Sequence, residues 1–234
     1  MQKKTLYFFA NDDTIMMVIK MKEFQYYIFD FDGTLVDSSE GIYNSIIYAL
    51  KEFGIEENDR EKLRYFIGPP LFHSFKHIYG VNDEDANWLI TKYRERYKLK
   101  GCEESVVYEG VPEMLKTLKE KGKKIAIASS KPKQFVDEIS KHLGIFNYYD
   151  YVSAESFDKT HSSKKDLINN VLEYFGNPDK SECLMIGDRF YDIDGAKATG
   201  LESAGAIFGL GEVEELTEAG ATYLLNDPME LVEF

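Results

Sequence analysis

The chain has 234 residues, which is enough for one sizeable domain or for a core domain with a smaller one attached. Hydrophobic residues make up 44% and aromatic residues 14%, a composition typical of a packed globular protein. The net charge of -13 argues against a binding surface for a nucleic-acid polymer or an anionic membrane, because both would be repelled.

No apolar run approaches the roughly 20 residues of a transmembrane helix, so we expect no membrane span. The two cysteines, Cys102 and Cys183, fall in different predicted units, and neither belongs to a CxxC motif. This pattern favours reduced thiols and a cytoplasmic location.

Residues 1–20 precede the first clear element and allow two interpretations. Because Met16, Met17 and Met21 lie close together, these residues could form an N-terminal extension in front of a domain that begins near Lys22. Alternatively, residues 15–19 could add an edge strand to that domain. The sequence alone does not decide between them.

The central element is an apolar strand over residues 26–29 that ends abruptly in Asp30, Asp32, Gly33 and Thr34. A strand buried on both faces is typical of a parallel sheet, and ligands bind at the carboxyl ends of such strands. The bare Asp-x-Asp-Gly pattern is equally compatible with a surface turn. Acids and a lysine further along the chain favour the site.

A helical unit without strands is expected over residues 37–107. Apolar spacing predicts a helix over 39–53, and three more helices follow at 59–66, at 71–79 and from Asn82 onward.

From residue 108 onward, helices alternate with short apolar strands. Strands are expected at 125–128, 149–153, 183–186, 204–207 and 223–225, with helices between them. This alternation predicts a doubly wound α/β fold, with a parallel sheet covered by helices on both faces. We therefore assign residues 21–36 and 108–234 to the core domain.

Three predicted strands end in polar side chains, namely Asp30 with Asp32, Ser129, and Asp188, and Asp192 follows one helical turn later. These side chains should meet at one edge of the sheet. Two charges about 4 Å apart cost roughly 4 kcal/mol at an effective dielectric near 20, so four carboxylates need a counter-ion. All-oxygen ligation beside a phosphate group favours Mg²⁺.

These residues resemble the motifs of phosphatases in the haloacid dehalogenase superfamily, and the likeness extends over residues 26–231. Residues 30–34 are similar to the first motif, Ser129 to the second, Lys164 to the third and residues 187–192 to the fourth. The resemblance implies a Rossmann-like core with an inserted helical cap domain at 37–107, whose loop 67–71 reaches the site.

The resemblance also implies roles for the four acids. Asp30 would be the nucleophile that takes the phosphoryl group, and Asp32 the general acid and then the general base. The Asp30 carboxylate, the Asp32 backbone carbonyl and Asp188 would hold Mg²⁺, with Asp192 supporting them.

The remaining motif residues are implied to bind phosphate. Ser129 and the amides around Ser130 would hold phosphoryl oxygens, and Lys164 would balance charge. Ser130 stands where many relatives have Asn. Lys165 is adjacent and could take the role of Lys164, while a solvated helix start would explain either lysine.

Three functions are compatible with this pattern. The first is Mg²⁺-dependent hydrolysis of a small phosphorylated metabolite, as in the phosphoglycolate phosphatase and 5'-nucleotidase-like branch. The others are a sugar phosphomutase and a non-catalytic regulatory protein. His73 and His77 are read as a surface or packed pair, with a metal site as the less favoured alternative. Arg189 is read as a surface charge at a helix start, with contact to the substrate as the less favoured alternative.

Overall fold

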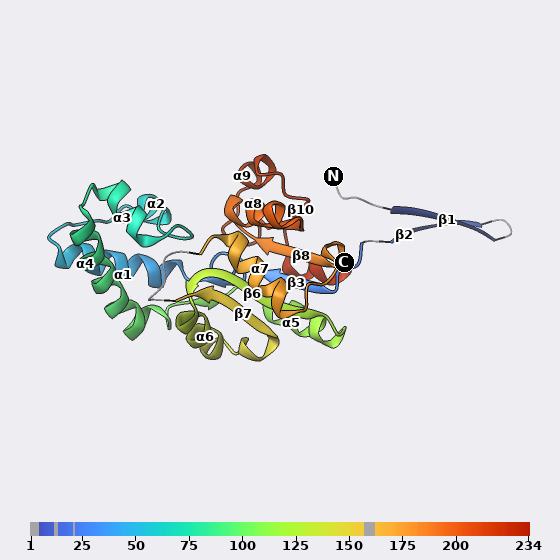
Figure 1. Ribbon diagram of the computed structural model, residues 1–234, viewed down its shortest axis with the longest axis horizontal. Helices are drawn as coiled ribbons and strands as arrows, with labels where there is room; N and C mark the ends of the chain where they lie inside the picture. The colour runs from blue at the N-terminus through green and yellow to red at the C-terminus, as the bar shows by residue number, and fades with distance from the viewer. Residues whose placement is uncertain (1–4, 12–13, 21, 157–161) are drawn as a thin grey trace.

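The computed structural model describes residues 5–11, 14–20, 22–156 and 162–234. Its centre is a six-stranded sheet in the order β10-β9-β8-β3-β6-β7 (Figure 1), and all five pairings are parallel. The strands are β3 (Tyr26–Phe29), β6 (Lys124–Pro132), β7 (Tyr151–Glu155), β8 (Cys183–Gly187), β9 (Glu202–Ala206) and β10 (Tyr223–Leu225). The predicted doubly wound α/β fold is therefore confirmed.

The strand order reverses direction at β3. From β3 the chain proceeds to β6 and β7 on one side, then crosses to β8, β9 and β10 on the other. The first strand in the core thus lies between β6 and β8, in the middle of the sheet. This is the switch point at which open α/β sheets bind ligands.

Alternate side chains of β3 pack into two hydrophobic cores, one on each face of the sheet. Ile28 packs on one face with its register partners Ala126 and Met185, while Phe29 belongs to the larger core on the other face. All of these side chains are buried because helices cover both faces. The helices of the core are α5 (Val111–Glu120), α6 (Lys133–His142), α7 (Lys164–Tyr174), α8 (Phe190–Thr199) and α9 (Val213–Glu218), with short 3-10 turns at Phe146–Tyr148, Lys180–Glu182 and Pro228–Glu233.

The helical unit, residues 37–107, lies at the carboxyl ends of the strands (Figure 1). Its helices are α1 (Ser39–Glu52), α2 (Arg60–Arg64), α3 (Leu71–Tyr79) and α4 (Asp83–Arg96), which continues into a π-helix, η1 (Tyr97–Gly101). The predicted starts of α2 and α4 agree with the structure. The side chains of Asp59 and Asn82 cap these helices by accepting hydrogen bonds from backbone N–H groups.

The expectation that residues 37–107 contain no strand is wrong in one detail. At the base of the helical unit, β4 (Val36–Asp37) pairs with β5 (Val106–Val107) in antiparallel fashion. The pair forms because the chain leaves and re-enters the core at the same place. Two residues per strand are too few for a sequence pattern to reveal.

The N-terminal residues form a separate antiparallel hairpin of β1 (Thr5–Asn11) and β2 (Thr14–Lys20). In the described part of the chain, neither strand pairs with the six-stranded sheet, and Figure 1 shows the hairpin apart from it. A strand does form over residues 15–19, but it is not an added edge strand of the core. Residues 1–4, 12–13 and 21 lie outside the described residues.

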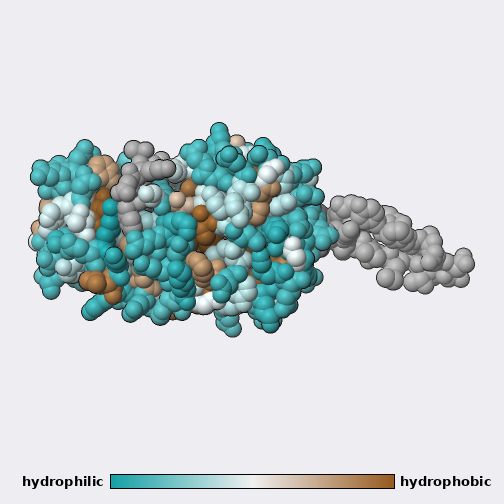
Figure 2. Space-filling view, turned by 60° about the horizontal axis from the view of Figure 1, so that its bottom comes forward, coloured by the Kyte–Doolittle hydropathy of each residue, from teal (hydrophilic) through white to brown (hydrophobic). Residues whose placement is uncertain are grey.

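The face of the molecule shown in Figure 2 is mainly hydrophilic. The face in Figure 2 carries hydrophobic residues only in small separate patches, in keeping with the net charge of -13. Among the described helices, none is long and apolar enough to cross a membrane.

Candidate active site

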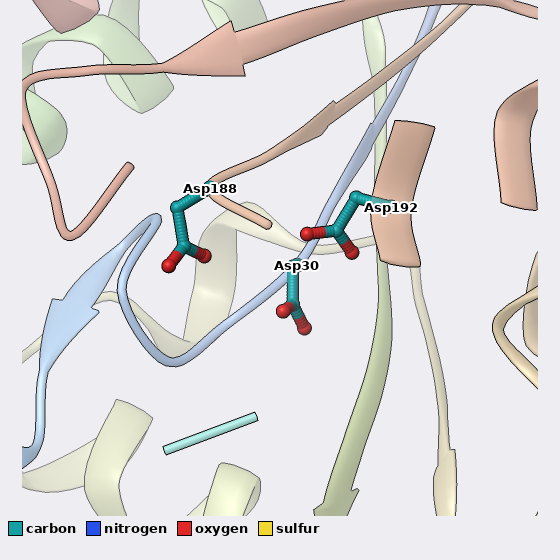
Figure 3. A group of neighbouring side chains, drawn as sticks. All are labelled: Asp30, Asp188 and Asp192. Atoms are coloured by element: carbon teal, nitrogen blue, oxygen red, sulfur yellow. The ribbon is translucent and has the colours of Figure 1, made fainter. Parts of the chain in front are cut away.

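Three carboxylates converge at the carboxyl end of β3 and β8. Asp30 follows β3, Asp188 follows β8, and Asp192 lies in the first turn of α8. Each offers an oxygen atom, and these three atoms lie within 4.8 Å of one another (Figure 3). Because β3 and β8 are neighbours in the sheet, residues 158 positions apart meet here.

Asp188 is buried and only partly satisfied. Its Oδ1 accepts a hydrogen bond from the Thr34 hydroxyl at 2.9 Å, whereas Oδ2 has no hydrogen-bond partner among the described residues. Burial, together with repulsion from Asp192 and Asp30, raises the pKa of Asp188 well above its usual range.

Gly33 allows the backbone to pass close to this acid. Its φ angle of +83° is in the left-handed region, and a Cβ atom at this position would lie 2.3 Å from Asp188 Oδ2. Any larger residue would therefore collide with the acid as well as strain the turn.

Lys164 is the cation of the cluster. Its Nζ lies 3.0 Å from Asp30 Oδ1 and 2.7 Å from Asp192 Oδ1, and it donates to the carbonyl of Ala128 at 3.0 Å. Burial opposes the charge, but attraction by Asp192 and Asp30 outweighs it, so the pKa of Lys164 is raised. Lys165, by contrast, is exposed.

The start of α7 sets which lysine enters the site. Ser163 caps the helix by accepting from the Asp166 N–H at 3.2 Å, and the Asp166 carboxylate accepts from Ser163 N–H at 3.1 Å. This reciprocal capping box fixes Lys164 as the first helical residue. Gly195 provides room, because a Cβ there would lie 2.7 Å from Lys164 Cγ.

Asp192 is held from two sides. Its Oδ2 accepts from the Arg189 N–H at 3.1 Å, and its Oδ1 lies beside Lys164. Burial raises the pKa of Asp192 to about 6, while the nearby Lys164 charge opposes the rise. Each oxygen of Asp192 therefore lies beside an N–H or ammonium group, whereas Asp188 Oδ2 has no such neighbour among the described residues.

This group of residues suits a hard divalent cation. Three carboxylates face one another with a single lysine close by, and a buried carboxylate oxygen of Asp188 lacks a partner. An all-oxygen donor set of this kind selects ions such as Mg²⁺ or Ca²⁺ over softer metals.

The Asp32 carboxylate lies outside that cluster and has its own partners. It accepts from the Ser38 hydroxyl at 2.5 Å, and Lys131 Nζ donates to its two oxygens at 2.9 and 3.0 Å. Sequence reasoning missed both partners. Ser38 follows the first motif, and Lys131 lies two residues after Ser129, so proximity to the motifs was the available signal.

The second motif lies at the end of β6. Ser129 is buried, and its Oγ accepts from the Lys131 N–H at 3.3 Å; the β6–β7 register shifts between Ser129 and Pro132. Ser130 is partly exposed. Both serines line the same cavity as Asp30, Asp32 and Lys164, so the structure brings all predicted site residues except Asp188 to its wall.

The cavity has a volume of about 550 Å³ and lies between the core and the helical unit. The helical unit contributes mainly apolar side chains, with polar groups on α4. These residues are Ile42, Phe66, Gly68, Pro69, Pro70, Leu71, Phe72, Asn87, Ile90, Thr91, Tyr93 and Arg94.

Arg189 is not the solvated surface charge that the sequence suggested. It lines the cavity, pairs with Glu215 at 3.0 Å, and donates to the Ile67 carbonyl of the helical unit at 3.3 Å. The sequence could not reveal this, because both partners come from distant segments. His73 and His77 are exposed on α3.

A parallel α/β sheet with two acids after its central strand, a lysine between carboxylates and an inserted helical unit defines a class of hydrolase. The family model of haloacid dehalogenase-like hydrolases matches residues 27–206. The chain belongs to this family, as its motifs indicated.

Individual relatives are similar over nearly the whole chain. A 5'-nucleotidase from Pseudomonas aeruginosa is 37% identical over 200 residues, 86% of this chain and 90% of its own length. The pyrophosphatase PpaX from Bacillus velezensis is 30% identical, covering 88% and 93%. The crystal structure of a predicted phosphatase from Clostridium acetobutylicum is 40% identical, with a TM-score of 0.84 over 90% of this chain and 97% of its own.

Proposed function

We propose that this protein hydrolyses a small phosphate monoester in a Mg²⁺-dependent reaction that passes through an aspartyl phosphate on Asp30. The observation that carries the proposal is the convergence of Asp30, Asp188 and Asp192 around Lys164 at the carboxyl end of the central strand. The named activities of the relatives, a nucleotidase and a pyrophosphatase, support phosphoryl chemistry.

In the first step, a carboxylate oxygen of Asp30 forms a bond to phosphorus, and the bond from phosphorus to the leaving oxygen breaks. Asp32, protonated for this step on an oxygen that has released its Lys131 or Ser38 contact, gives its proton to that oxygen. In the second step, Asp32 takes a proton from water, the water oxygen bonds to phosphorus, and the bond to Asp30 breaks to release phosphate. Splitting the hydrolysis in this way replaces one difficult displacement with two easier ones.

The other site residues position charge. Asp188 with its unpartnered oxygen, the Asp30 carboxylate and the Asp32 carbonyl would hold Mg²⁺, while Asp192 has both oxygens engaged and would orient Lys164. A bound Mg²⁺ supplies positive charge beside the phosphoryl oxygens.

Phosphate binding falls to the end of β6 and the start of α7. Ser129, Ser130 and Lys164 line one wall of the cavity and provide hydroxyl, amide and ammonium donors. Such donors would stabilise the negative charge that spreads over the phosphoryl oxygens during transfer.

The helical unit would act as a cap domain that selects the leaving group. It supplies the apolar wall of the cavity, and a site of about 550 Å³ lies in the range of small-molecule sites. We propose a small phosphorylated metabolite, similar to a nucleoside monophosphate or phosphoglycolate, as the substrate.

The test is a screen of phosphomonoesters with Mg²⁺ and with chelator. We expect phosphate release that chelator abolishes and Mg²⁺ restores, and turnover in excess chelator would contradict the metal role. Asp30→Asn should abolish release from every ester, whereas Asp194→Asn, an exposed acid on α8, is the matched control. Conversion of a sugar phosphate to its isomer without free phosphate would indicate a phosphomutase instead.

A further inference from the structure

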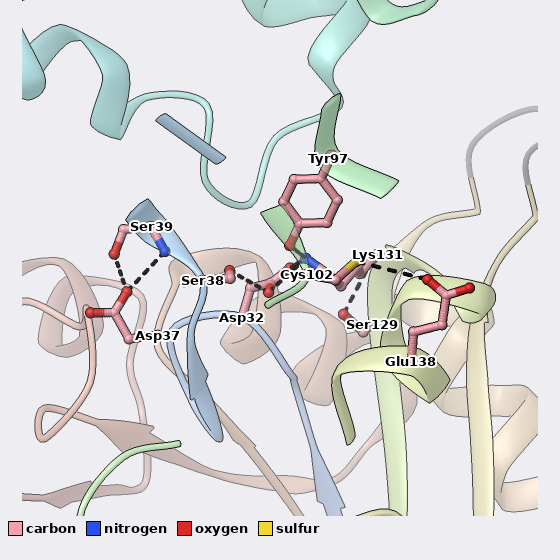
Figure 4. Close-up of polar contacts among 9 residues, drawn as sticks. All are labelled: Asp32, Asp37, Ser38, Ser39, Tyr97, Cys102, Ser129, Lys131 and Glu138. Carbon is pink, nitrogen blue, oxygen red and sulfur yellow. Dashed lines mark hydrogen bonds and ion pairs between the residues drawn. The ribbon is translucent and has the colours of Figure 1, made fainter. Parts of the chain in front are cut away.

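Lys131 connects the proposed acid, Asp32, to the π-helix of the helical unit. Lys131 Nζ donates to both oxygens of Asp32 and to the Tyr97 hydroxyl at 2.8 Å (Figure 4). Asp32 and Lys131 belong to the core, whereas Tyr97 begins the π-helix η1 of the helical unit. The contact therefore bridges the two sides of the cavity.

The three contacts use all the hydrogen-bonding capacity of Lys131. An ammonium group has three N–H donors, and here the acceptors are Asp32 Oδ1, Asp32 Oδ2 and Tyr97 Oη. In this arrangement no donor remains for a phosphate oxygen. Lys131 differs from Lys164 in the acid that it contacts, because Lys164 lies beside Asp30 and Asp192 and not beside Asp32.

The ion pair between Lys131 and Asp32 is largely buried. Only 5% of the Lys131 side chain and 15% of the Asp32 side chain are exposed. A charge in such a place is held in one geometry by its partners, since water cannot replace them. Ser38 adds a hydrogen bond to Asp32 Oδ1, so the carboxylate is fixed from two directions.

Tyr97 is itself held firmly. It is fully buried and stacks on Tyr93 with ring centroids 5.2 Å apart, and it packs in a T-shaped arrangement with Phe135, whose ring centroid lies 5.0 Å away. A Cβ on Gly101, at the end of η1, would lie 2.6 Å from the Tyr97 ring. The π-helix thus presents a rigid hydroxyl to Lys131, and such π-helical turns often occur at functional sites.

We propose that Lys131 is a positioning residue that holds the Asp32 carboxylate toward the leaving group, and that Tyr97 makes this alignment depend on the packing of the helical unit against the core. The inference rests on the proposed function of Asp32 in proton transfer. It adds Lys131 and Tyr97 to the residues on which the reaction depends.

The closing experiment compares an alkyl phosphate with 4-nitrophenyl phosphate, because only the alkyl alcohol needs a proton to leave. Lys131→Met should lower kcat/KM for the alkyl ester by about 100-fold or more, the usual range for a displaced general acid. For the aryl ester the loss should stay below about 10-fold, and the Kd of inorganic phosphate should stay within about 3-fold.

Two further variants define the mechanism. Tyr97→Phe keeps the ring and removes the hydroxyl, so it should lower kcat/KM for the alkyl ester by about 3- to 10-fold, in the same direction. Lys131→Arg should recover part of the lost rate because it keeps the charge. Lys133→Met is the matched control, an exposed lysine two residues away that pairs with Asp137 on its own helix.

Three outcomes would overturn the proposal. Weaker phosphate binding in parallel with the loss of kcat/KM would make Lys131 a substrate ligand. Equal losses for both esters, with a lower Tm, would make its role structural. Finally, a crystal structure of Lys131→Met should show the Asp32 carboxylate turned from its place, and an unmoved carboxylate would contradict the proposal. This test does not depend on activity. If the wild type cleaves no ester, that result refutes only the proposed function.

Discussion

At the scale of single residues, Lys164 is the cation that compensates the negative charges of Asp30 and Asp192. One ammonium group contacts Asp30, Asp192 and the Ala128 carbonyl, and its side chain is only 8% exposed. Removing it would leave the buried Asp192 and the largely buried Asp30 without their shared cation, a change that is costly in a site shielded from water.

The adjacent lysines give a direct test. Lys164→Ala should lower kcat by about 10²-fold or more, because phosphate and Asp30 would then repel each other without compensation. Lys165→Ala removes an exposed side chain and should leave kcat near the wild-type value. Steady-state kinetics on one active ester measures both, and the reverse ranking would transfer the role to Lys165.

At the scale of elements, the turn before α2 connects the helices of the helical unit. Glu57 accepts from Lys62 Nζ at 2.7 Å, from the Tyr79 hydroxyl at 2.9 Å, and from the N–H groups of Asn58 and Asp59. The hydrogen bond from Lys62, together with these backbone and hydroxyl donors, lowers the pKa of Glu57 to about 2.

The lowered pKa gives the helical unit a defined acid sensitivity. Because the ordinary value is 4.5, the ionised form stabilises the fold above about pH 4.5, and this contribution is lost as pH falls toward 2. Glu57→Gln should lower Tm at neutral pH by several degrees, at about 2–4 °C per kcal/mol for a chain of this size. The difference from wild type should shrink as pH falls to about 2.

The fluorescence of Trp88 is a suitable measurement, since it is the single tryptophan and packs on Phe53 within the helical unit. Glu61→Gln, an exposed acid of α2, is the control. A Glu57→Gln deficit that stays constant down to the lowest pH would show that the loss does not come from ionisation.

The loop between α2 and α3 should control substrate choice. Gly68, Pro69 and Pro70 line the cavity on the side of the helical unit, whereas Asp30, Asp32 and Asp192 line it on the side of the core. Pro69→Ala should therefore change kcat/KM by different factors for a nucleotide, phosphoglycolate, a sugar phosphate and an aryl phosphate. If one common factor describes all four esters, the loop does not select the leaving group.

Elements and motifs were predictable where the signal is local. Asp59 and Asn82 mark helix starts through their own backbone contacts, and the apolar run of β3 ends visibly in its acids. The link from Lys131 to Asp32 joins residues 99 positions apart, and its one sign in the sequence is that Lys131 lies two residues after Ser129. The π-helix that presents Tyr97 likewise departs from helical periodicity only once tertiary packing is in place.

At the scale of the whole molecule, the N-terminal hairpin is independent of the sheet that carries the site. Since β1 and β2 pair with each other and, in the described ranges, with no core strand, a protein that begins at Met21 should remain soluble and active. Its Tm and kcat/KM should match those of the full chain. Insoluble protein or a large drop in Tm would show that the core needs the hairpin.

The acidic surface has a consequence for how substrate arrives. A molecule with a net charge of -13 repels a phosphate ester at long range, even though Lys131 and Lys164 lie inside the cavity. Dissolved salt screens this repulsion, and the screening length is about 10 Å at 0.1 M ionic strength. At saturating Mg²⁺, kcat/KM for a doubly charged ester should therefore increase with moderate NaCl, so that ionic strength assists the encounter between two anions.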